Sequence, residues 1–313
     1  MKIHRVGTVV ACGLLLAALR CAKKEPSGAP KTEQAAAPSA PKVAEQKPPP
    51  YTYPAPVKGH FKEVNICSFG VVDGIAYKSG AGTVVFVTSK PIASPVLAGS
   101  PCPMTEARSL VALRNASYLE VTLDAAGKSR YFVSGTAFAG SSREESVGHS
   151  WSSTLKAASG RAAGAVKHRY GTFTFDLPVL APATPQVSQG DWVQGNRSHA
   201  SLPRPAEQAV TAAYRAAHEA ALKKDWKALL AAIGFDEKQS AAIRGLEGID
   251  ADFAVYADRF LSPGDPGEFT AKAGTAYVRG AGTNSKGKKF ANFYHFVPCS
   301  DHLVVVSIAE NPQ

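Results

Sequence analysis

The spacing of apolar residues changes once near the C-terminus, and this change constrains the fold more than any other feature of the chain. Before the segment Pro263-Gly264-Asp265-Pro266-Gly267, apolar residues recur every three or four positions, as helices require. After it they alternate every two positions, as strands require. Helices followed by antiparallel strands are typical of an α+β domain in which a curved sheet packs on its helices. We therefore expect such a domain over residues 205–313.

The helical part of this domain has clear start and stop signals. Pro205 suits a first helical position, because its missing N–H would be unpaired there anyway. A second short helix is expected to end before Gly234, and Asp236 is expected to cap a third helix that runs towards Leu261. One apolar stripe marks the buried face of the first helix: Val210, Tyr214, Ala217, Ala221 and Leu222.

Three strands are expected after the Pro- and Gly-rich segment 263–267, at about Phe269 to Arg279, Lys289 to Val297 and His302 to Ala309. The segment HEAALKKDWKALLAAI followed by the strands GTAYVRG, FANFYHFV and HLVVVSI resembles the NTF2-like (cystatin-like) domains of bacterial lipoproteins. The resemblance implies a cone-shaped pocket between helices and sheet, used for catalysis or binding in some relatives and filled in others. The candidate pocket residues are Tyr214, His218, Trp226, Tyr256, Tyr277, Tyr294 and His295.

Residues 59–182 indicate an all-β domain. Phe173, Phe175 and Leu177 alternate with polar residues, which is typical of a strand with one buried face. At least six short strands separated by turns predict a β-sandwich or an open barrel, with one short helix over Thr105 to Leu113. Residues 183–204 carry the Pro-rich pieces APATPQ and LPRPAE and are expected to be an interdomain linker.

The N-terminus is typical of an exported protein. Lys2 and Arg5 precede an apolar run from Val6 to Leu19 that is too short to span a bilayer and suits a secretory signal over residues 1–21. Ala18-Leu19-Arg20-Cys21 resembles the lipobox of bacterial lipoproteins, which implies that Cys21 is lipidated, although Arg20 stands where a small residue is usual. Cys12 follows a better local pattern but leaves a very short apolar core. Ordinary cleavage and an uncleaved anchor remain alternatives.

Residues 22–58, which we call the tether, consist mainly of Pro, Ala and Lys and have little to bury. A disordered, extended spacer after an acyl anchor would hold a folded part away from a membrane surface. The net charge of +10 is concentrated before residue 200, and acidic and basic residues balance from Ala200 onward. Without a strongly basic folded segment, nucleic-acid binding has no support.

Three of the five cysteines would remain after export and lipidation. In an oxidising compartment Cys67 and Cys102 are the expected disulfide, with Cys299 left over; three buried thiols are the alternative. We also considered His295, Cys299, Asp301 and His302 as metal ligands around a hairpin turn. A hydrogen-bonded core histidine explains His295 more simply, so no metal site is predicted.

No complete set of catalytic residues is present, and no cofactor is predicted. Gly282 to Lys289 nearly matches a phosphate-binding loop, but Lys289 stands where Ser or Thr must bind magnesium, and the segment joins two expected strands. We therefore expect an anchored lipoprotein of the inner or outer membrane that faces the periplasm or the cell surface, bound to lipid through its acyl anchor. Its role would be non-catalytic binding of an envelope protein or a small apolar ligand, or envelope assembly. The alternatives are a periplasmic enzyme that uses the NTF2-like cavity and a purely structural spacer.

Overall fold

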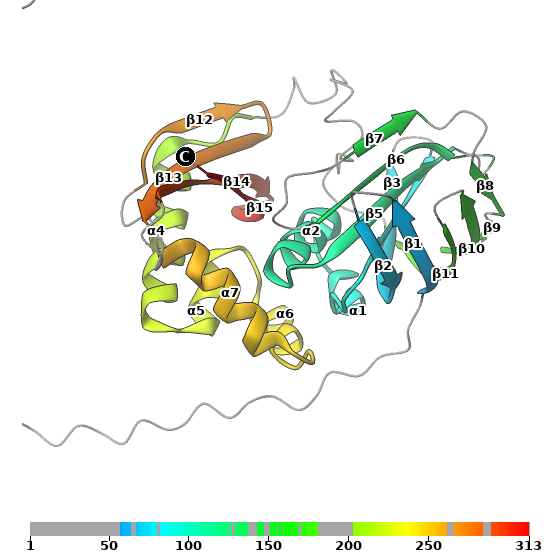
Figure 1. The fold of residues 1–313 in the computed structure, drawn as a ribbon, viewed down its shortest axis with the longest axis horizontal. Coiled ribbons are helices and arrows are strands. Elements are labelled where there is room, and N and C mark those ends of the chain that lie inside the picture. The colour runs from blue at the N-terminus through cyan, green and yellow to red at the C-terminus, as the bar shows by residue number, and fades with distance from the viewer. Residues whose placement is uncertain are drawn as a thin grey trace, which may run out of the picture. The chain divides into compact units, whose positions relative to one another are not determined.

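The computed structural model describes residues 57–63, 67–79, 82–124, 126, 129–136, 143–146, 151–154, 156–158, 160–168, 171–180, 203–261, 266–283 and 289–312 (Figure 1). These residues belong to one compact unit, Gln46–Gln313. They form six helices and two sheets of mostly antiparallel strands, which confirms the α+β class. The predicted signal peptide, Cys21 and nearly all of the tether lie outside the described residues. Strand β1 begins at Val57, inside the predicted end of the tether.

The described strands before residue 181 form one hydrogen-bonded network of 11 strands in which β11 is central. β11 pairs antiparallel with β1 and β10, and its C-terminal end pairs parallel with β3. The strands are β1 Val57–Glu63, β2 Cys67–Val71, β3 Asp73–Ser79, β4 Gly82–Thr88, β5 Ser117–Leu123, β6 Ser129–Thr136, β7 Arg143–Ser146, β8 Trp151–Ser153, β9 Lys156–Ala158, β10 Arg161–His168 and β11 Gly171–Leu180.

Strands β3, β4 and β5 are buried on both faces. Val85 and Val121 on one face pack with Phe61, Phe173 and other residues of β1 and β11 in one hydrophobic cluster. Tyr77 and Phe86 on the opposite face join a second cluster that contains helical residues. Because both faces are covered, β4 carries the continuous apolar run Val84–Val87 without the alternation that marks a half-exposed strand.

Two helices between β4 and β5 provide that cover: α1 Ser94–Leu97 and α2 Pro103–Leu113. The helix predicted from Thr105 is present and starts at Pro103, because proline is favoured in the first helical turn. α2 is buried almost all around its axis and packs against β3, β15 and α7. A helix with this much buried surface needs partners on several sides. It therefore connects the β-rich segment to the C-terminal segment.

The first C-terminal helix begins later than predicted: α4 spans Glu207–Lys223 with Ala206 as its N-cap, so Pro205 precedes the helix. The second agrees with its predicted end before Gly234: α5 spans Trp226–Ala232 with Asp225 as its side-chain cap. The predicted stripe is wrong at one position: Leu222 is 61% exposed. Ala220 is buried in its place, because it lies on the side of α4 that faces the core.

The predicted third helix is two helices, α6 Glu237–Arg244 and α7 Ile249–Leu261. Asp236 forms the expected cap as part of a capping box with Gln239. The break occurs at Gly245, which caps α6, and at Gly248, whose φ of 72° lies in the left-handed region that favours glycine.

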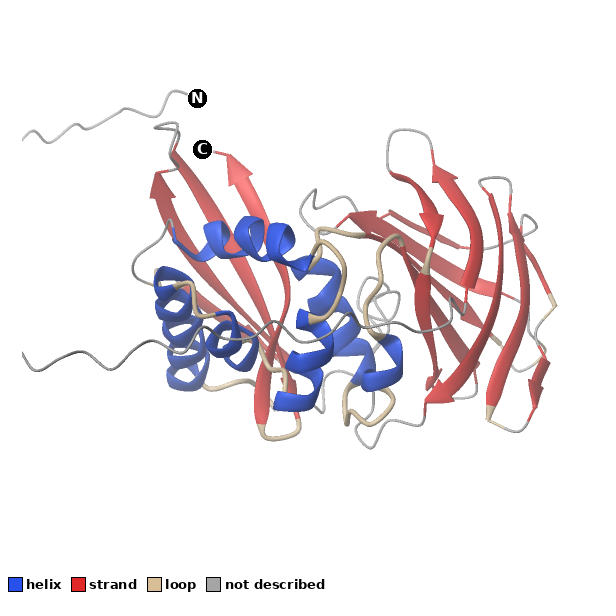
Figure 2. Ribbon diagram, turned by 90° about the horizontal axis from the view of Figure 1, so that it is seen from below, coloured by secondary structure: helices blue, strands red, loops and turns tan. Residues whose placement is uncertain are grey.

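The C-terminal sheet is an antiparallel meander in the order β12-β13-β14-β15. Figure 2 shows the helices of this part, in blue, on one face of its strands. The strand predicted from Phe269 to Arg279 is split by a turn at Gly274. β13 ends at Thr283 and pairs with β14, which begins at Lys289, so the segment that nearly matches a phosphate-binding loop connects two paired strands. The strands are β12 Phe269–Lys272, β13 Thr275–Thr283, β14 Lys289–Cys299 and β15 His302–Pro312.

Candidate functional site

The space between the C-terminal helices and their sheet, where the sequence predicted a pocket, is occupied by aromatic rings. Tyr214 of α4, Phe260 of α7 and Tyr294 of β14 are all 0% exposed. The rings of Tyr214 and Tyr294 are 4.9 Å apart in an edge-to-face arrangement, and those of Phe260 and Tyr294 are also 4.9 Å apart. Tyr256 extends the cluster, with its ring 5.5 Å from that of Phe260. Such contacts are those of a packed core.

The hydroxyls of Tyr256 and Tyr294 remain protonated. Burial raises the pKa of Tyr256 and of Tyr294 well above the ordinary range. The Tyr294 hydroxyl donates to the carbonyl of Arg259 and accepts from Asn292 Nδ2 at 3.3 Å. Asn292 Nδ2 also donates to the Arg259 carbonyl at 3.0 Å, so these polar atoms bond to one another and to the helix end. A group that holds its proton this tightly is a poor general acid or base near neutral pH.

The remaining predicted pocket residues lie outside this interior cluster or at its edge. Trp226 stacks on Phe253 with ring centroids 5.2 Å apart. The rings of His218 and Tyr214 are edge to face, with centroids 6.5 Å apart. Tyr277 and His295 are cross-strand partners that stack at 4.5 Å. They lie on the face of the sheet opposite Tyr294, because neighbouring strand residues point to opposite faces. The structure therefore divides the predicted pocket set between two faces.

His295 is held as a neutral imidazole. Its Nε2 forms a short hydrogen bond with Thr275 Oγ1. Burial, together with the positive charge of Arg108 on α2, lowers the pKa of His295 to about 3. Arg108 itself pairs with the fully buried Glu120 at 2.6 Å. These contacts lie where α2 approaches the outer face of the C-terminal sheet.

The predicted disulfide between Cys67 and Cys102 is wrong, because Cys102 is bonded to Cys299. The two cysteines are 197 positions apart in the sequence, and their Cα atoms are 5.7 Å apart. Cys102 caps α2, which faces the hairpin between β14 and β15, whereas Cys67 begins β2 in the large sheet. Both bonded cysteines are 0% exposed.

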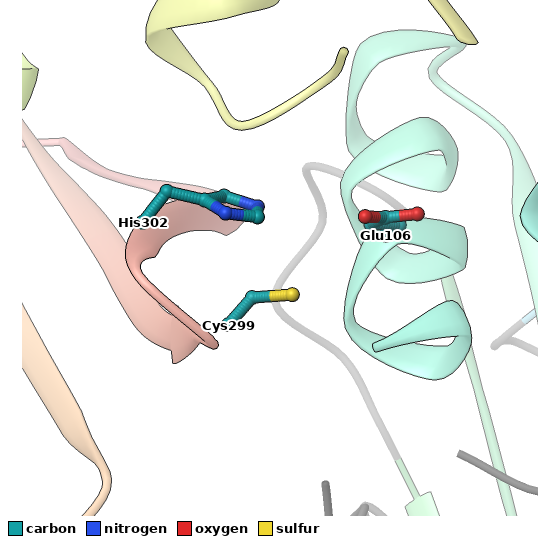
Figure 3. A group of neighbouring side chains, drawn as sticks. All are labelled: Glu106, Cys299 and His302. Carbon is teal, nitrogen blue, oxygen red and sulfur yellow. The ribbon is translucent and has the colours of Figure 1, made fainter. Parts of the chain in front are cut away.

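Two polar side chains, Glu106 and His302, lie beside Cys299 of this disulfide (Figure 3). The ligand-type atoms of Glu106, Cys299 and His302 all lie within 4.8 Å of one another. Cys299 and His302 are paired residues that flank a two-residue turn, where Ser300 has a φ of 54°. Glu106 lies one helical turn after Cys102, the N-cap of α2, so the two residues lie on the same side of the helix.

Glu106 and His302 are each oriented by a second group. Gln239 Nε2 donates to Glu106 Oε2 at 2.6 Å, and His302 Nδ1 lies 3.2 Å from Asp301 Oδ1. Burial raises the pKa of Glu106 to about 7, although hydrogen bonds from Ser100 and Gln239 favour its charged form. His302 Nε2 is buried and has no hydrogen-bond partner among the described residues.

Gly234 allows the hairpin to approach this closely. Its φ is 105°, and an added Cβ would lie 2.8 Å from Val304 Cγ2 and 3.2 Å from His302 Cδ2. The sequence placed Cys299 and His302 together but grouped them with His295, whose Nε2 is instead hydrogen-bonded to Thr275 Oγ1. It missed Glu106, because an acidic residue in a first helical turn is explained by the helix dipole alone.

Comparisons of the chain with protein-family models, with curated proteins and with solved structures find no match. Among the described residues, none of the helices combines the length and the apolarity that crossing a membrane requires.

Proposed function

We propose that this protein is an exported lipoprotein, anchored through Cys21, whose folded part is a non-catalytic binding or envelope-assembly module. The signal, the candidate lipobox and the Pro-rich tether support export and anchoring. The buried Cys102–Cys299 disulfide supports the same location, because structural disulfides persist mainly in oxidising compartments.

We also propose that residues 205–313 form an NTF2-like domain. Helices α4 to α7 followed by a four-stranded antiparallel meander have the expected element order, and the helices pack on one face of that sheet. In this proposal the domain is of the filled kind, in which aromatic side chains replace the pocket.

The single observation that supports a binding role over catalysis is the aromatic packing of Tyr214, Phe260 and Tyr294. A catalytic cavity needs space for substrate beside an acid or base with a useful pKa. These rings fill the space, and the neighbouring hydroxyls hold their protons. Recognition would then use the outer surface of the folded unit.

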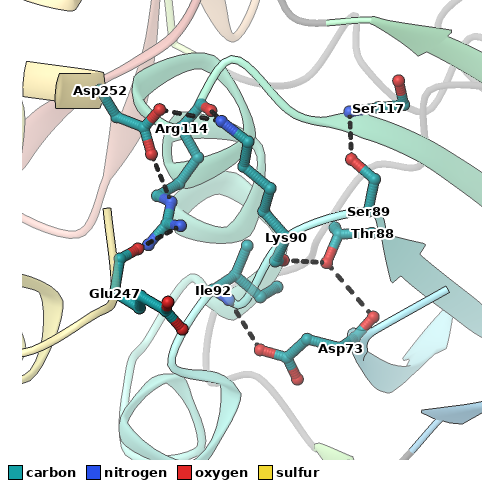
Figure 4. A network of polar contacts seen from close by, with 9 residues as sticks. All are labelled: Asp73, Thr88, Ser89, Lys90, Ile92, Arg114, Ser117, Glu247 and Asp252. Carbon is teal, nitrogen blue, oxygen red and sulfur yellow. Dashed lines mark hydrogen bonds and ion pairs between the residues drawn. The ribbon is translucent and has the colours of Figure 1, made fainter. Parts of the chain in front are cut away.

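A polar network supports a rigid unit rather than two independent parts (Figure 4). Lys90 Nζ contacts Asp252 Oδ1 at 2.8 Å, and Arg114 Nε contacts Asp252 Oδ2 at 2.9 Å. Arg114 also donates to the carbonyl of Glu247 at 2.9 Å. Lys90 and Arg114 belong to the β-rich segment and Asp252 to α7, so these contacts join the two segments. A rigid unit presents a fixed surface to a partner, which suits assembly.

The anchor is tested by expressing the full chain in a bacterial host with labelled palmitate. We expect label on the wild type and on Cys12→Ser, and no label on Cys21→Ser. Label that persists on Cys21→Ser, or that is absent from the wild type, contradicts the anchor.

The binding role is tested by crosslinking the full chain in envelope preparations and identifying the attached proteins. Tyr294→Phe should keep the same crosslinked partners, because its change lies inside the core. Absence of any reproducible partner would contradict the assembly role, and turnover of a small-molecule substrate that Tyr294→Phe abolishes would favour the enzyme alternative.

A further inference from the structure

The disulfide lies among groups that a buried structural disulfide does not need. Cys102 and Cys299 are already fully buried, yet the carboxylate of Glu106 on α2 and the imidazole of His302 on β15 lie within 4.8 Å of Cys299 Sγ (Figure 3). Thiolate, imidazole and carboxylate are the three side-chain types that zinc prefers, and four such ligands are usual in a structural site.

We propose that Cys102, Cys299, His302 and Glu106 are the ligands of a tetrahedral zinc site that forms when the Cys102–Cys299 disulfide is reduced. This site goes beyond the proposed binding role. The same two cysteines would link α2 to the β14–β15 hairpin either through a covalent bond or through a metal ion.

The geometry supports this ligand set. Zinc bonds of about 2.0 to 2.3 Å place the ligand atoms of a tetrahedral site roughly 3.3 to 3.8 Å apart. The atoms of Glu106, Cys299 and His302 already lie within 4.8 Å of one another, so small side-chain rotations suffice. Cys102 Sγ is one bond length from Cys299 Sγ, and after reduction the two sulfurs must separate to the tetrahedral spacing through rotation of their side chains.

The hydrogen-bond partners of the ligand residues His302 and Glu106 are those expected at a metal site. A histidine ligand usually donates its second ring nitrogen to a carboxylate, which fixes the ring and leaves the first nitrogen for the metal. His302 has this arrangement, with Nδ1 facing Asp301 at 3.2 Å and Nε2 buried without a hydrogen-bond partner among the described residues. Glu106 is fixed in turn by Gln239 at 2.6 Å.

The change between the two states balances chemically. A dithiol reductant transfers two hydrogens to the disulfide, becomes a disulfide itself and leaves two thiols on the protein. Zinc then displaces the thiol protons and any proton on Glu106, and these are released to solvent. Access is from the side of His302, whose side chain is 37% exposed.

The test uses the full chain, purified in detergent and reduced anaerobically with a trialkylphosphine. The phosphine takes up the oxygen of one water and becomes a phosphine oxide, while the two sulfurs gain hydrogen. After zinc addition and desalting, we expect about one tightly held zinc per reduced chain and none per oxidised chain. Cobalt in place of zinc should give thiolate-to-metal charge-transfer absorption in the reduced protein alone.

Variants separate this site from adventitious binding. Cys299→Ala should hold no zinc, whereas Cys67→Ala, a matched change outside the cluster, should hold as much as the wild type. His302→Ala and Glu106→Gln should weaken zinc binding by tenfold or more in chelator competition. Asp301→Asn keeps all four ligands but removes the carboxylate that faces His302 Nδ1. It should therefore weaken zinc binding at least about tenfold. The proposal is overturned if the fully reduced wild type retains no zinc, or if Asp301→Asn and His302→Ala bind it as tightly as the wild type.

Discussion

Removing the Cys102–Cys299 disulfide should strongly destabilise the folded unit. We consider the double variant Cys102→Ala/Cys299→Ala, which leaves no unpaired thiol at the site. The bond links residues 197 positions apart. In the chain-entropy model a crosslink over a loop of this length removes unfolded-state freedom that corresponds to about 5 kcal/mol at room temperature. Measured disulfides more often contribute about 2 to 4 kcal/mol, so we expect a loss in the range of about 2 to 5 kcal/mol.

Urea unfolding of the full chain, followed by both tryptophan fluorescence and far-ultraviolet circular dichroism, measures this loss. Two probes are needed because a unit this large can unfold through intermediates. Cys67→Ala is the matched control and should change the midpoint little. A reductant without added metal should lower the wild-type midpoint towards that of the double variant and leave the double variant unchanged.

The reasoning is refuted if the double variant loses less than about 1 kcal/mol while the wild type contains the bond. It is also refuted if the reductant destabilises the double variant as much as the wild type. Either result would mean that α2 and the β14–β15 hairpin are held together by their apolar packing and that the crosslink restricts little of the unfolded chain.

Three further predictions concern stability and use the same unfolding assay. Phe260→Ala should cost about 3 to 5 kcal/mol, because it empties the centre of the aromatic core, whereas Leu222→Ala on the exposed side of α4 should change stability by less than about 0.5 kcal/mol. Asp252→Ala should cost about 3 kcal/mol, because the nearly buried Arg114 loses its carboxylate, and Asp258→Ala on the exposed face of α7 should cost little. Burial raises the pKa of Glu106 from 4.5 to about 7. Between these two pH values the folded protein therefore keeps a proton on Glu106 that the unfolded chain has released. Wild-type stability should therefore contain a contribution that falls by about 3 kcal/mol as pH rises from about 4.5 to about 7, and Glu106→Gln should remove this fall; equal slopes in both proteins would contradict it.

Local signals predicted much of the C-terminal segment. Asp236 and Gly234 act at helix ends through contacts within a few residues, so this cap and this helix end could be inferred directly from the sequence. The change in the spacing of apolar residues at segment 263–267 likewise predicted where the sheet begins. The split between α6 and α7 was missed because the apolar stripe continues across Gly245 and Gly248 and hides the interruption.

The failed predictions depend on contacts between residues far apart in the sequence. The partner of Cys102 is decided by the docking of α2 on β15, which no spacing pattern reports. The candidate pocket residues were treated as one set because aromatic residues at strand and helix positions do not reveal which face they occupy. Register decides this: Tyr277 pairs with His295, and Val278 pairs with Tyr294, so the two pairs point to opposite faces of the sheet.

The position of α2 explains why the β-rich and helical segments form one unit. Its residues Leu110 and Val111 share a hydrophobic cluster with Phe86 of the large sheet and Phe253 of α7. At its N-terminus Cys102 joins a smaller cluster with Val304 and Val306 of β15. If the chain were divided at the predicted linker, α2 would remain with the β-rich segment and expose its apolar side, and β15 would expose its outer face. The two segments therefore stabilise each other through one helix, and the disulfide, the carboxylate of Glu106 and the Lys90–Arg114–Asp252 contacts all lie at that helix or beside it.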